Sequence, residues 1–200
     1  MKNFDWPYIT SGIPDAEFIR GKVPMTKQEV RSISLAKLRL LTDSVIVDIG
    51  AGTGSVAIEA ARLSTQGQVY AIEREPEALA LIKQNQQRFG VNLKLMSGDA
   101  VNCLTELEYF DRAFIGGSGG CLSKIISLCD ERLPIGGRIV VNAITLETAF
   151  HAISIFRELQ YSELEAVSIN IARGRLLAKS TLMESLNPVT IVCASKGTLV

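Results

Sequence analysis

The sequence predicts an α/β fold, a parallel sheet with helices on both faces and an antiparallel pair of strands at one edge. Short apolar runs rich in β-branched residues alternate with helical patterns over residues 44–159. A glycine-rich turn at residues 50–54 joins the first run to a helical pattern. Two strand-like runs, 163–171 and 189–195, then follow without a helical crossover between them, which favours antiparallel pairing.

The chain begins with an irregular segment, residues 1–25, which contains three prolines and two glycines. Thr26 and Glu29 then match a capping box, with Thr26 as the N-cap of a helix that should run to about Arg39. From this pattern alone, we interpret Thr26 as a helix cap.

Five strands are expected before residue 159, and all but the third are followed by a helix whose bounds can be predicted. They are Ser44–Ile49, Gln68–Glu73, Asn92–Met96, Phe110–Ile115 and Arg138–Asn142. The helices should cover residues 55–63, Pro76 to Gly90, the stretch around Ile125 and Leu128, and Leu146–Leu159. In the last helix, we place Leu146, Phe150, Ile153 and Phe156 on one apolar side. No repeat or linker interrupts the pattern, so residues 1–200 are predicted to form one domain.

Composition is typical of a globular protein, with 47% hydrophobic and 21% charged residues. No apolar run is long enough to cross a membrane, and the N-terminus lacks the apolar core of a signal peptide. The four cysteines are scattered, which indicates neither a metal site nor a disulfide framework. We therefore expect a cytoplasmic protein.

Charge is unevenly distributed, although the net charge is zero. Residues 1–42 carry a net +3, residues 43–172 a net −6 and residues 173–200 a net +3. The two basic ends could meet on one side of the fold and receive an anionic partner, or the pattern could be ordinary surface variation. The neutral total argues against general binding of nucleic acid.

The glycine turn has the pattern D-x-G-x-G-x-G, which starts at Asp48 and includes Gly50, Gly52 and Gly54. A dinucleotide fingerprint would need a small residue three positions after the second glycine, where this chain has Ser55. A P-loop is excluded because no Lys-Ser/Thr follows the glycines. The turn thus predicts a nucleotide-like ligand at the end of the first strand.

Acidic residues follow the second and third strands. Glu73 could accept hydrogen bonds from both hydroxyls of a ribose, or it could be a solvated charge at a strand end. Asp99 could accept a hydrogen bond from an adenine amino group, with Ala100 beside the ring, or it could cap the next helix.

Together these features resemble the class I S-adenosylmethionine-dependent methyltransferases. The resemblance implies a Rossmann-like, seven-stranded and mostly parallel sheet that ends in an antiparallel strand pair. The sulfonium carries an activated methyl group, so the protein must mainly align a nucleophile and exclude water. The chain accordingly shows no catalytic Ser-His-Asp set, and we interpret its single histidine, His151, as a surface residue. No catalytic residue is predicted.

Further segments resemble a narrower family, the precorrin C-15 methyltransferases of cobalamin biosynthesis, also found as the C-terminal half of precorrin-6Y methylase. They are Val23–Thr26, Asp111–Gly120, Asn170–Arg175 and Asn187–Val189. The resemblance implies methylation of C-15 of a precorrin or cobalt-precorrin, with loss of carbon dioxide from the C-12 acetate. It also implies a homotetramer and the cofactor contacts Thr26, Gly50, Ala51, Gly52, Thr53, Gly54, Glu73 and Ala100.

A precorrin is a flat macrocycle edged with carboxylates, so its site should be broad and bordered by cations. The glycine cluster at residues 116–120 would let a large ring approach the backbone, and we predict contacts at Gly117, Ser118 and Gly119. Arg173 and Arg175 could bind carboxylates, or they could serve a subunit contact. Lys179, Arg20 and Lys22 are weaker candidates.

Two alternatives remain open at this level: a methyltransferase acting on another substrate, such as an adenine in tRNA, and a non-catalytic nucleotide-binding module. The sequence does not determine whether the substrate contains cobalt or which residue assists decarboxylation. Whether a separate C-5 methyltransferase is a partner is equally undetermined.

Overall fold

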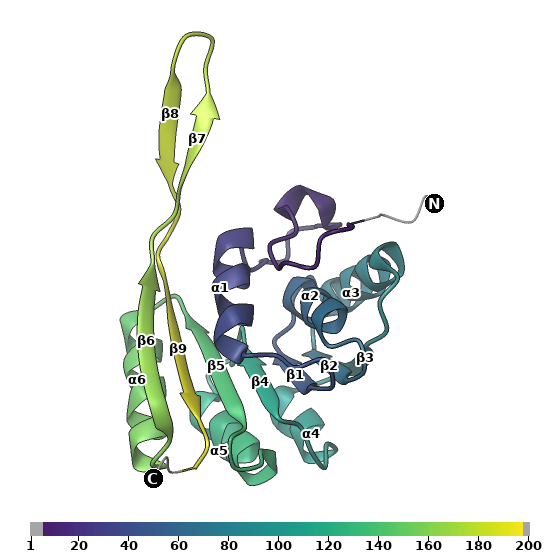
Figure 1. Ribbon diagram of the computed structural model, residues 1–200, viewed down its shortest axis with the longest axis vertical. Coiled ribbons are helices and arrows are strands. Elements are labelled where there is room, and N and C mark those ends of the chain that lie inside the picture. The colour runs from purple at the N-terminus through teal and green to yellow at the C-terminus, as the bar shows by residue number, and fades with distance from the viewer. Residues whose placement is uncertain (1–5, 198–200) are drawn as a thin grey trace.

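A seven-stranded sheet forms the centre of the molecule, in a computed structural model that describes residues 6–197 (Figure 1). Its strand order is β3-β2-β1-β4-β5-β9-β6, and β9 alone runs antiparallel to its neighbours. The strands are β1 (Val45–Ile49), β2 (Gln68–Glu73), β3 (Lys94–Ser97), β4 (Arg112–Ile115), β5 (Arg138–Ala143), β6 (Ser162–Ile169) and β9 (Val189–Ser195). The predicted α/β class and sheet are therefore confirmed, with β3 and β4 each starting two residues later than expected.

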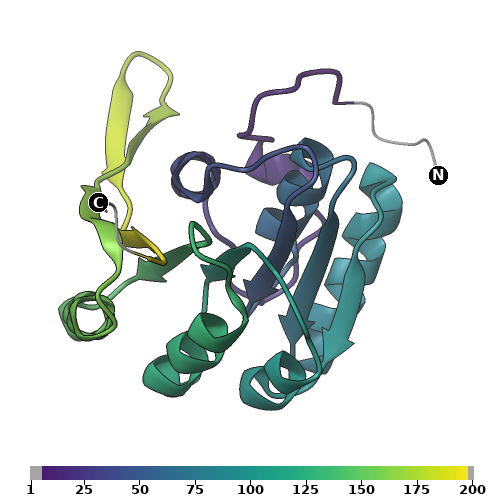
Figure 2. The same ribbon diagram turned by 60° about the horizontal axis from the view of Figure 1, so that its bottom comes forward.

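Helices cover both faces of the sheet (Figure 2). On one face lie α1 (Gln28–Leu38), α2 (Ser55–Leu63) and α3 (Pro76–Phe89), and on the other α4 (Ala100–Thr105), α5 (Leu122–Arg132) and α6 (Leu146–Glu158). Alternation along the strands separates two hydrophobic cores: Ile46 belongs to the first and Val47 to the second. A 3-10 turn, η1 (Asp15–Glu17), lies in the N-terminal segment.

Two local predictions are wrong. The helix α1 starts at Gln28, with Lys27 as its N-cap residue, so Thr26 caps nothing. Its capping-box partner Glu29 instead forms an ion pair with Arg173, because a tertiary charge partner is available there. In α6, Leu146 and Phe150 are 81% and 70% exposed. The buried side of α6 is formed by Ala149, Ala152, Ile155 and Phe156, so of the predicted set Phe156 is correctly placed.

The stretch between β6 and β9 forms a hairpin that the sequence analysis missed. Its strands β7 (Ala172–Leu176) and β8 (Thr181–Ser185) pair antiparallel, and the hairpin extends away from the rest of the molecule (Figure 1). All ten of its strand residues are exposed. Because neither face is buried, these strands carry no apolar alternation by which they could have been recognised.

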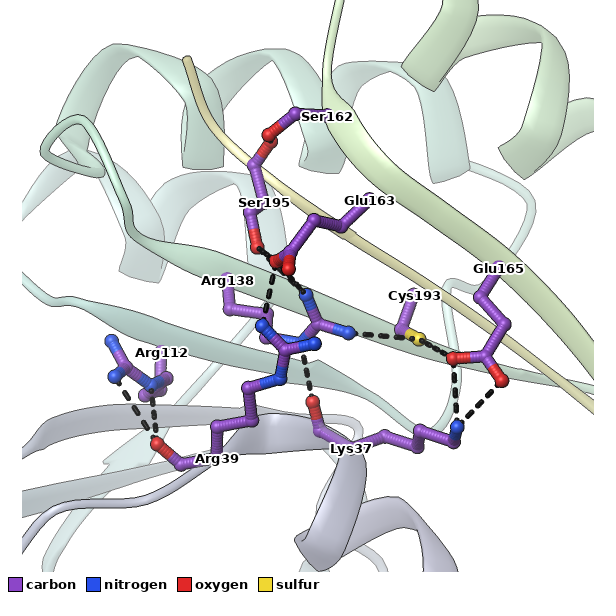
Figure 3. Close-up of polar contacts among 9 residues, drawn as sticks. All are labelled: Lys37, Arg39, Arg112, Arg138, Ser162, Glu163, Glu165, Cys193 and Ser195. Atoms are coloured by element: carbon purple, nitrogen blue, oxygen red, sulfur yellow. Dashed lines mark hydrogen bonds and ion pairs between the residues drawn. The ribbon is translucent and has the colours of Figure 1, made fainter. Parts of the chain in front are cut away.

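Arg138 joins β5, β6, β9 and α1 at the amino end of β5 (Figure 3). It is 2% exposed, and its guanidinium donates to the carbonyl of Lys37, to Ser195 Oγ at 2.7 Å and to Glu163 Oε2 at 3.1 Å. Arg39 and Ser195, which both hydrogen-bond to Glu163, hold the pKa of that carboxyl below its usual range. This cluster attaches the antiparallel edge to the body of the sheet.

Within residues 6–197, no helix is both long enough and apolar enough to cross a membrane.

Candidate active site

A cavity of about 690 Å³ opens where β1, β2, β4 and β5 end. From β1 the chain adds β2 and then β3 on one side, and it then returns to add β4 and β5 on the other side of β1. Ligands of such sheets bind in the crevice at the carboxyl ends of the strands at this point. Ten of the predicted site residues line the cavity: Thr26, Gly50, Ala51, Gly52, Glu73, Asp99, Ala100, Gly117, Ser118 and Gly119.

The two glycine clusters meet at the cavity. A Cβ atom on Gly50 would lie only 2.6 Å from the carbonyl oxygen of Gly117. One on Gly52 would lie 2.9 Å from the carbonyl oxygen of Pro24, and both glycines have positive φ angles, of 70° and 58°. Side chains at these positions would therefore be strained and would clash with backbone. Glycine here allows three chain segments to form one continuous wall.

Glu73, at the end of β2, is held by backbone amides. Its Oε2 accepts from Gly52 N at 2.8 Å, and its Oε1 accepts from Arg74 N at 2.8 Å and Glu75 N at 3.0 Å. A carboxylate offers about four acceptor positions, so Oε2 keeps one for a ligand. The glycine loop and the predicted ribose acceptor are thus parts of one hydrogen-bonded unit.

Asp48 lies beneath the glycine loop and does not line the cavity. Its Oδ2 accepts from Ala57 N at 2.9 Å, while its buried Oδ1 has no hydrogen-bond partner among the described residues. Burial raises the pKa of Asp48 to about 7; the hydrogen bond from Ala57 opposes this and the charge of Glu73 adds to it. The residue therefore anchors the start of α2, with a carboxyl that is partly protonated near neutral pH.

Asp99 is the N-cap of α4, where its Oδ1 accepts from Val101 N at 2.9 Å. The capping alternative is thus correct, and Asp99 also lines the cavity beside Ala100. Thr53 and Gly54 do not line it. Thr53 is buried, and Gly54 packs against Ile82 of α3.

The N-terminal segment covers one side of the cavity, which Val23–Lys27 line. Arg31 holds this segment in place: it is fully buried and donates to the carbonyls of Ile13 and Thr26. It also forms ion pairs with Asp15 at 3.3 Å and with Glu59 at 2.6 Å. This role was not predictable from the sequence, because the partners of Arg31 lie up to 28 residues away and share no motif with it.

Arg173 and Arg175 are not among the residues that line the cavity. Arg173 pairs with Glu29 at 2.6 Å and with Asp15 at 3.1 Å, and Arg175 pairs with Glu184 at 2.6 Å. The hydrogen bond with Glu29 raises the pKa of Arg173 and lowers that of Glu29. Cations that do line the cavity are Lys22, Lys27 and Arg74.

A further part of the cavity comes from β5, β9 and the segments that lead to and from the hairpin. It consists of Asn142, Ile144, Ile171, Leu186, Asn187 and Val189. Of these, Ile171, Asn187 and Val189 lay in segments that resemble the precorrin family in sequence. The others come from distant parts of the chain, which the sheet topology brings together.

No group of three or more His, Cys, Asp or Glu side chains in the described part of the chain is arranged to hold a metal ion.

Comparison with known proteins gives consistent matches. A family model for a precorrin methyltransferase domain matches residues 17–196. A probable cobalt-precorrin-6B C(15)-methyltransferase (decarboxylating) from Pyrobaculum aerophilum is 43% identical over 193 residues, which cover 94% of this chain and 98% of the relative. The crystal structure of a precorrin-6Y C5,15-methyltransferase from Geobacter metallireducens superposes with a TM-score of 0.89 at 42% identity, covering 94% of this chain and 98% of that one. A precorrin 8W decarboxylase from Methanobacterium thermoautotrophicum gives a TM-score of 0.86 at 41% identity, covering 92% and 99%.

Proposed function

The chain belongs to the precorrin methyltransferase family, and we propose that it methylates C-15 of cobalt-precorrin-6B in cobalamin biosynthesis. The methyl donor is S-adenosylmethionine, and the C-12 acetate of the substrate is lost as carbon dioxide. The observation that carries this proposal is the contact between the two glycine clusters, because it places a nucleotide-type loop and a wall without bulky side chains in one cavity.

The residues on the β1 and β2 side fit the donor. Glu73 keeps one acceptor position on Oε2 for a ribose hydroxyl, and Asp99 and Ala100 lie at the next strand end, where an adenine would bind. The loop Gly50–Gly52 and Thr26 would surround the methionine part. Thr53 and Gly54 do not line the cavity, so they would support this loop without contacting the cofactor. S-adenosylmethionine supplies the activated methyl group, and the chain has to orient it and exclude water.

The residues on the β4 and β5 side fit the acceptor. Gly117, Ser118 and Gly119 form a wall without bulky side chains, against which a flat macrocycle can lie. Lys22 and Lys27 from the N-terminal segment and Arg74 from the end of β2 also line the cavity and can pair with the peripheral carboxylates. Binding of carboxylates by Arg173 and Arg175 stays a prediction, and it would require these side chains to leave their present ion pairs.

We further propose that the protein assembles as a homotetramer through the β7–β8 hairpin. An isolated two-stranded hairpin is at best marginally stable in water. This one projects from the body and exposes Leu176 by 82% and Met183 by 59% (Figure 1). A second copy of the chain that covered these side chains would remove the exposed apolar surface. Light scattering on the intact protein and on Leu176→Glu tests this assembly.

The function is tested by incubating the protein with isotope-labelled S-adenosylmethionine and either cobalt-precorrin-6B or its metal-free counterpart, followed by mass analysis. The expected product gains one methyl group and loses one carbon dioxide. Calorimetry should detect binding of S-adenosylhomocysteine and not of NAD. Binding of NAD alone, or transfer of methyl groups to tRNA and not to corrinoids, would overturn the proposal.

A further inference from the structure

The uncharged part of the cavity and Asn142 within it suggest where the substrate loses carbon dioxide. The six residues that β5, β9 and the hairpin-connecting segments contribute, Asn142, Ile144, Ile171, Leu186, Asn187 and Val189, include no acid and no base. All three lysine and arginine residues that line the cavity come instead from the N-terminal segment and the end of β2. None of the charged residues that line the cavity comes from the segments that contribute these six residues.

Asn142 is the one polar side chain that β5 supplies to this part of the cavity, and a hydrogen bond from α1 orients it. Its Oδ1 lies 3.0 Å from Ser34 Oγ on α1. Its Nδ2 is buried and has no hydrogen-bond partner among the described residues. A buried amide without a hydrogen-bond partner destabilises the protein that holds it. Because Asn142 also lines the cavity, a turn of its amide toward a substrate oxygen would give Nδ2 an acceptor and remove that cost.

We propose that this uncharged part of the cavity is the decarboxylation subsite, in which Asn142 Nδ2 donates a hydrogen bond to the carboxylate of the departing acetate. The inference rests on the proposed function and adds to it the place where the second half of the reaction occurs. In this step the bond between the acetate methylene and its carboxylate carbon breaks, and carbon dioxide leaves. The electron pair leaves the methylene carbon for the conjugated macrocycle, where it balances the positive charge that the transferred methyl group brings, and an exocyclic methylene remains. This methylene becomes a methyl group when it takes up a proton and C-15 releases its own hydrogen as a proton, so that no net proton is gained.

The absence of a cation from these six residues favours this step. A lysine or arginine beside the carboxylate would stabilise its localised negative charge, which the transition state disperses into the macrocycle. Uncharged, largely apolar surroundings withhold that ground-state stabilisation, while a neutral amide still orients the group. The methyl group arrives with a formal positive charge, and the electron pair released by decarboxylation neutralises it.

The test measures two quantities for each variant: the rate of methyl transfer, and the fraction of methylated product that has lost carbon dioxide. Ile144→Lys places an ammonium group in the uncharged part at a position that is 74% exposed and tolerant of change. We expect the decarboxylated fraction in early product to fall at least tenfold. Leu146→Lys adds the same charge two residues away, at a position that does not line the cavity, and should leave this fraction unchanged.

Asn142→Leu removes the amide at similar size and should also lower the decarboxylated fraction. Asn142→Asp places a negative charge beside the acetate and should weaken substrate binding at least tenfold. Binding of S-adenosylhomocysteine shows that each variant is folded. If a variant of Asn142 does not fold, Asn142→Ser is used in its place. Methylated product that is decarboxylated as fully in Ile144→Lys and Asn142→Leu as in the parent would overturn the subsite. Absence of methyl transfer in the parent protein would instead overturn the proposed function.

Discussion

The carboxylate of Glu73 accepts a hydrogen bond from the backbone amide of Gly52, with 2.8 Å between Oε2 and N. This bond joins the end of β2 to the glycine loop after β1. The shape of the loop and the position of the expected ribose acceptor therefore depend on each other. A change at either residue should affect both.

Glu73→Gln should weaken binding of S-adenosylhomocysteine by about 10-fold to 100-fold, because hydrogen bonds to a charged group contribute roughly 1.5–3 kcal/mol. Isothermal titration calorimetry measures the change. Glu106→Gln alters an exposed carboxylate that does not line the cavity and serves as the control. An unchanged affinity for Glu73→Gln would remove Glu73 from the cofactor site.

Gly50→Ala should abolish cofactor binding, since its Cβ would lie 2.6 Å from the carbonyl oxygen of Gly117. Gly90→Ala is a matched control: its φ is also positive, at 62°, but no atom lies within 4 Å of the added Cβ. Both variants should lose about 1 kcal/mol of stability from backbone strain, and only the first should lose binding. Gly52→Val is expected to behave like Gly50→Ala. Equal binding by the two alanine variants would show that the contact between the glycine clusters is unimportant.

Asp48 should make stability depend on pH. Burial raises its pKa from the ordinary value of 3.8 to about 7, so between these values the folded protein binds a proton that the unfolded chain does not. The contribution of this group to stability is therefore present at low pH and is lost as the pH rises through 7. Relative to the parent, Asp48→Asn should gain about 2 kcal/mol between pH 5.5 and pH 8 in urea unfolding. A difference between parent and variant that is constant with pH would contradict this, and Asp43→Asn controls for the loss of an exposed carboxylate.

Arg138→Met should lower the free energy of unfolding by about 3–5 kcal/mol, because it leaves the polar groups around a buried guanidinium without their partner (Figure 3). Arg39→Ala removes a cation that pairs with the same Glu163 but is 56% exposed, and it should cost under about 1 kcal/mol. Urea unfolding of both variants measures the difference. Similar losses for the two would mean that burial does not determine the importance of Arg138.

Arg173→Ala should weaken binding of the macrocycle more than binding of S-adenosylhomocysteine. The double variant Arg173→Glu with Glu29→Arg keeps an ion pair at this place but reverses the charge that a substrate would meet. We expect it not to restore substrate affinity. Full restoration by the double variant would assign Arg173 to structure alone.

Much of this protein was predictable because the relevant signals are local. Apolar runs that alternate with helical patterns identified the strands of the sheet and the helices that cover it. The glycine turn, with Glu73 and Asp99, identified one side of the cavity. Errors arose where two local patterns were equally good. Leu146 and Phe150 repeat at helical spacing as well as Ala149 and Ala152 do, and only contact with the sheet distinguishes the buried side of α6.

The sequence by itself determined the fold class and the nucleotide-type loop, because residues close in the chain specify strands, turns and helix starts. Only the tertiary structure decided that Gly50 touches Gly117, that Arg31 holds the N-terminal segment and that Asn142 lines the cavity. It also decided that Arg173 faces Glu29 and Asp15 rather than the cavity. These contacts join residues that are distant in the chain. Which of them form depends on how the sheet orders its strands, and that order is a property of the whole fold.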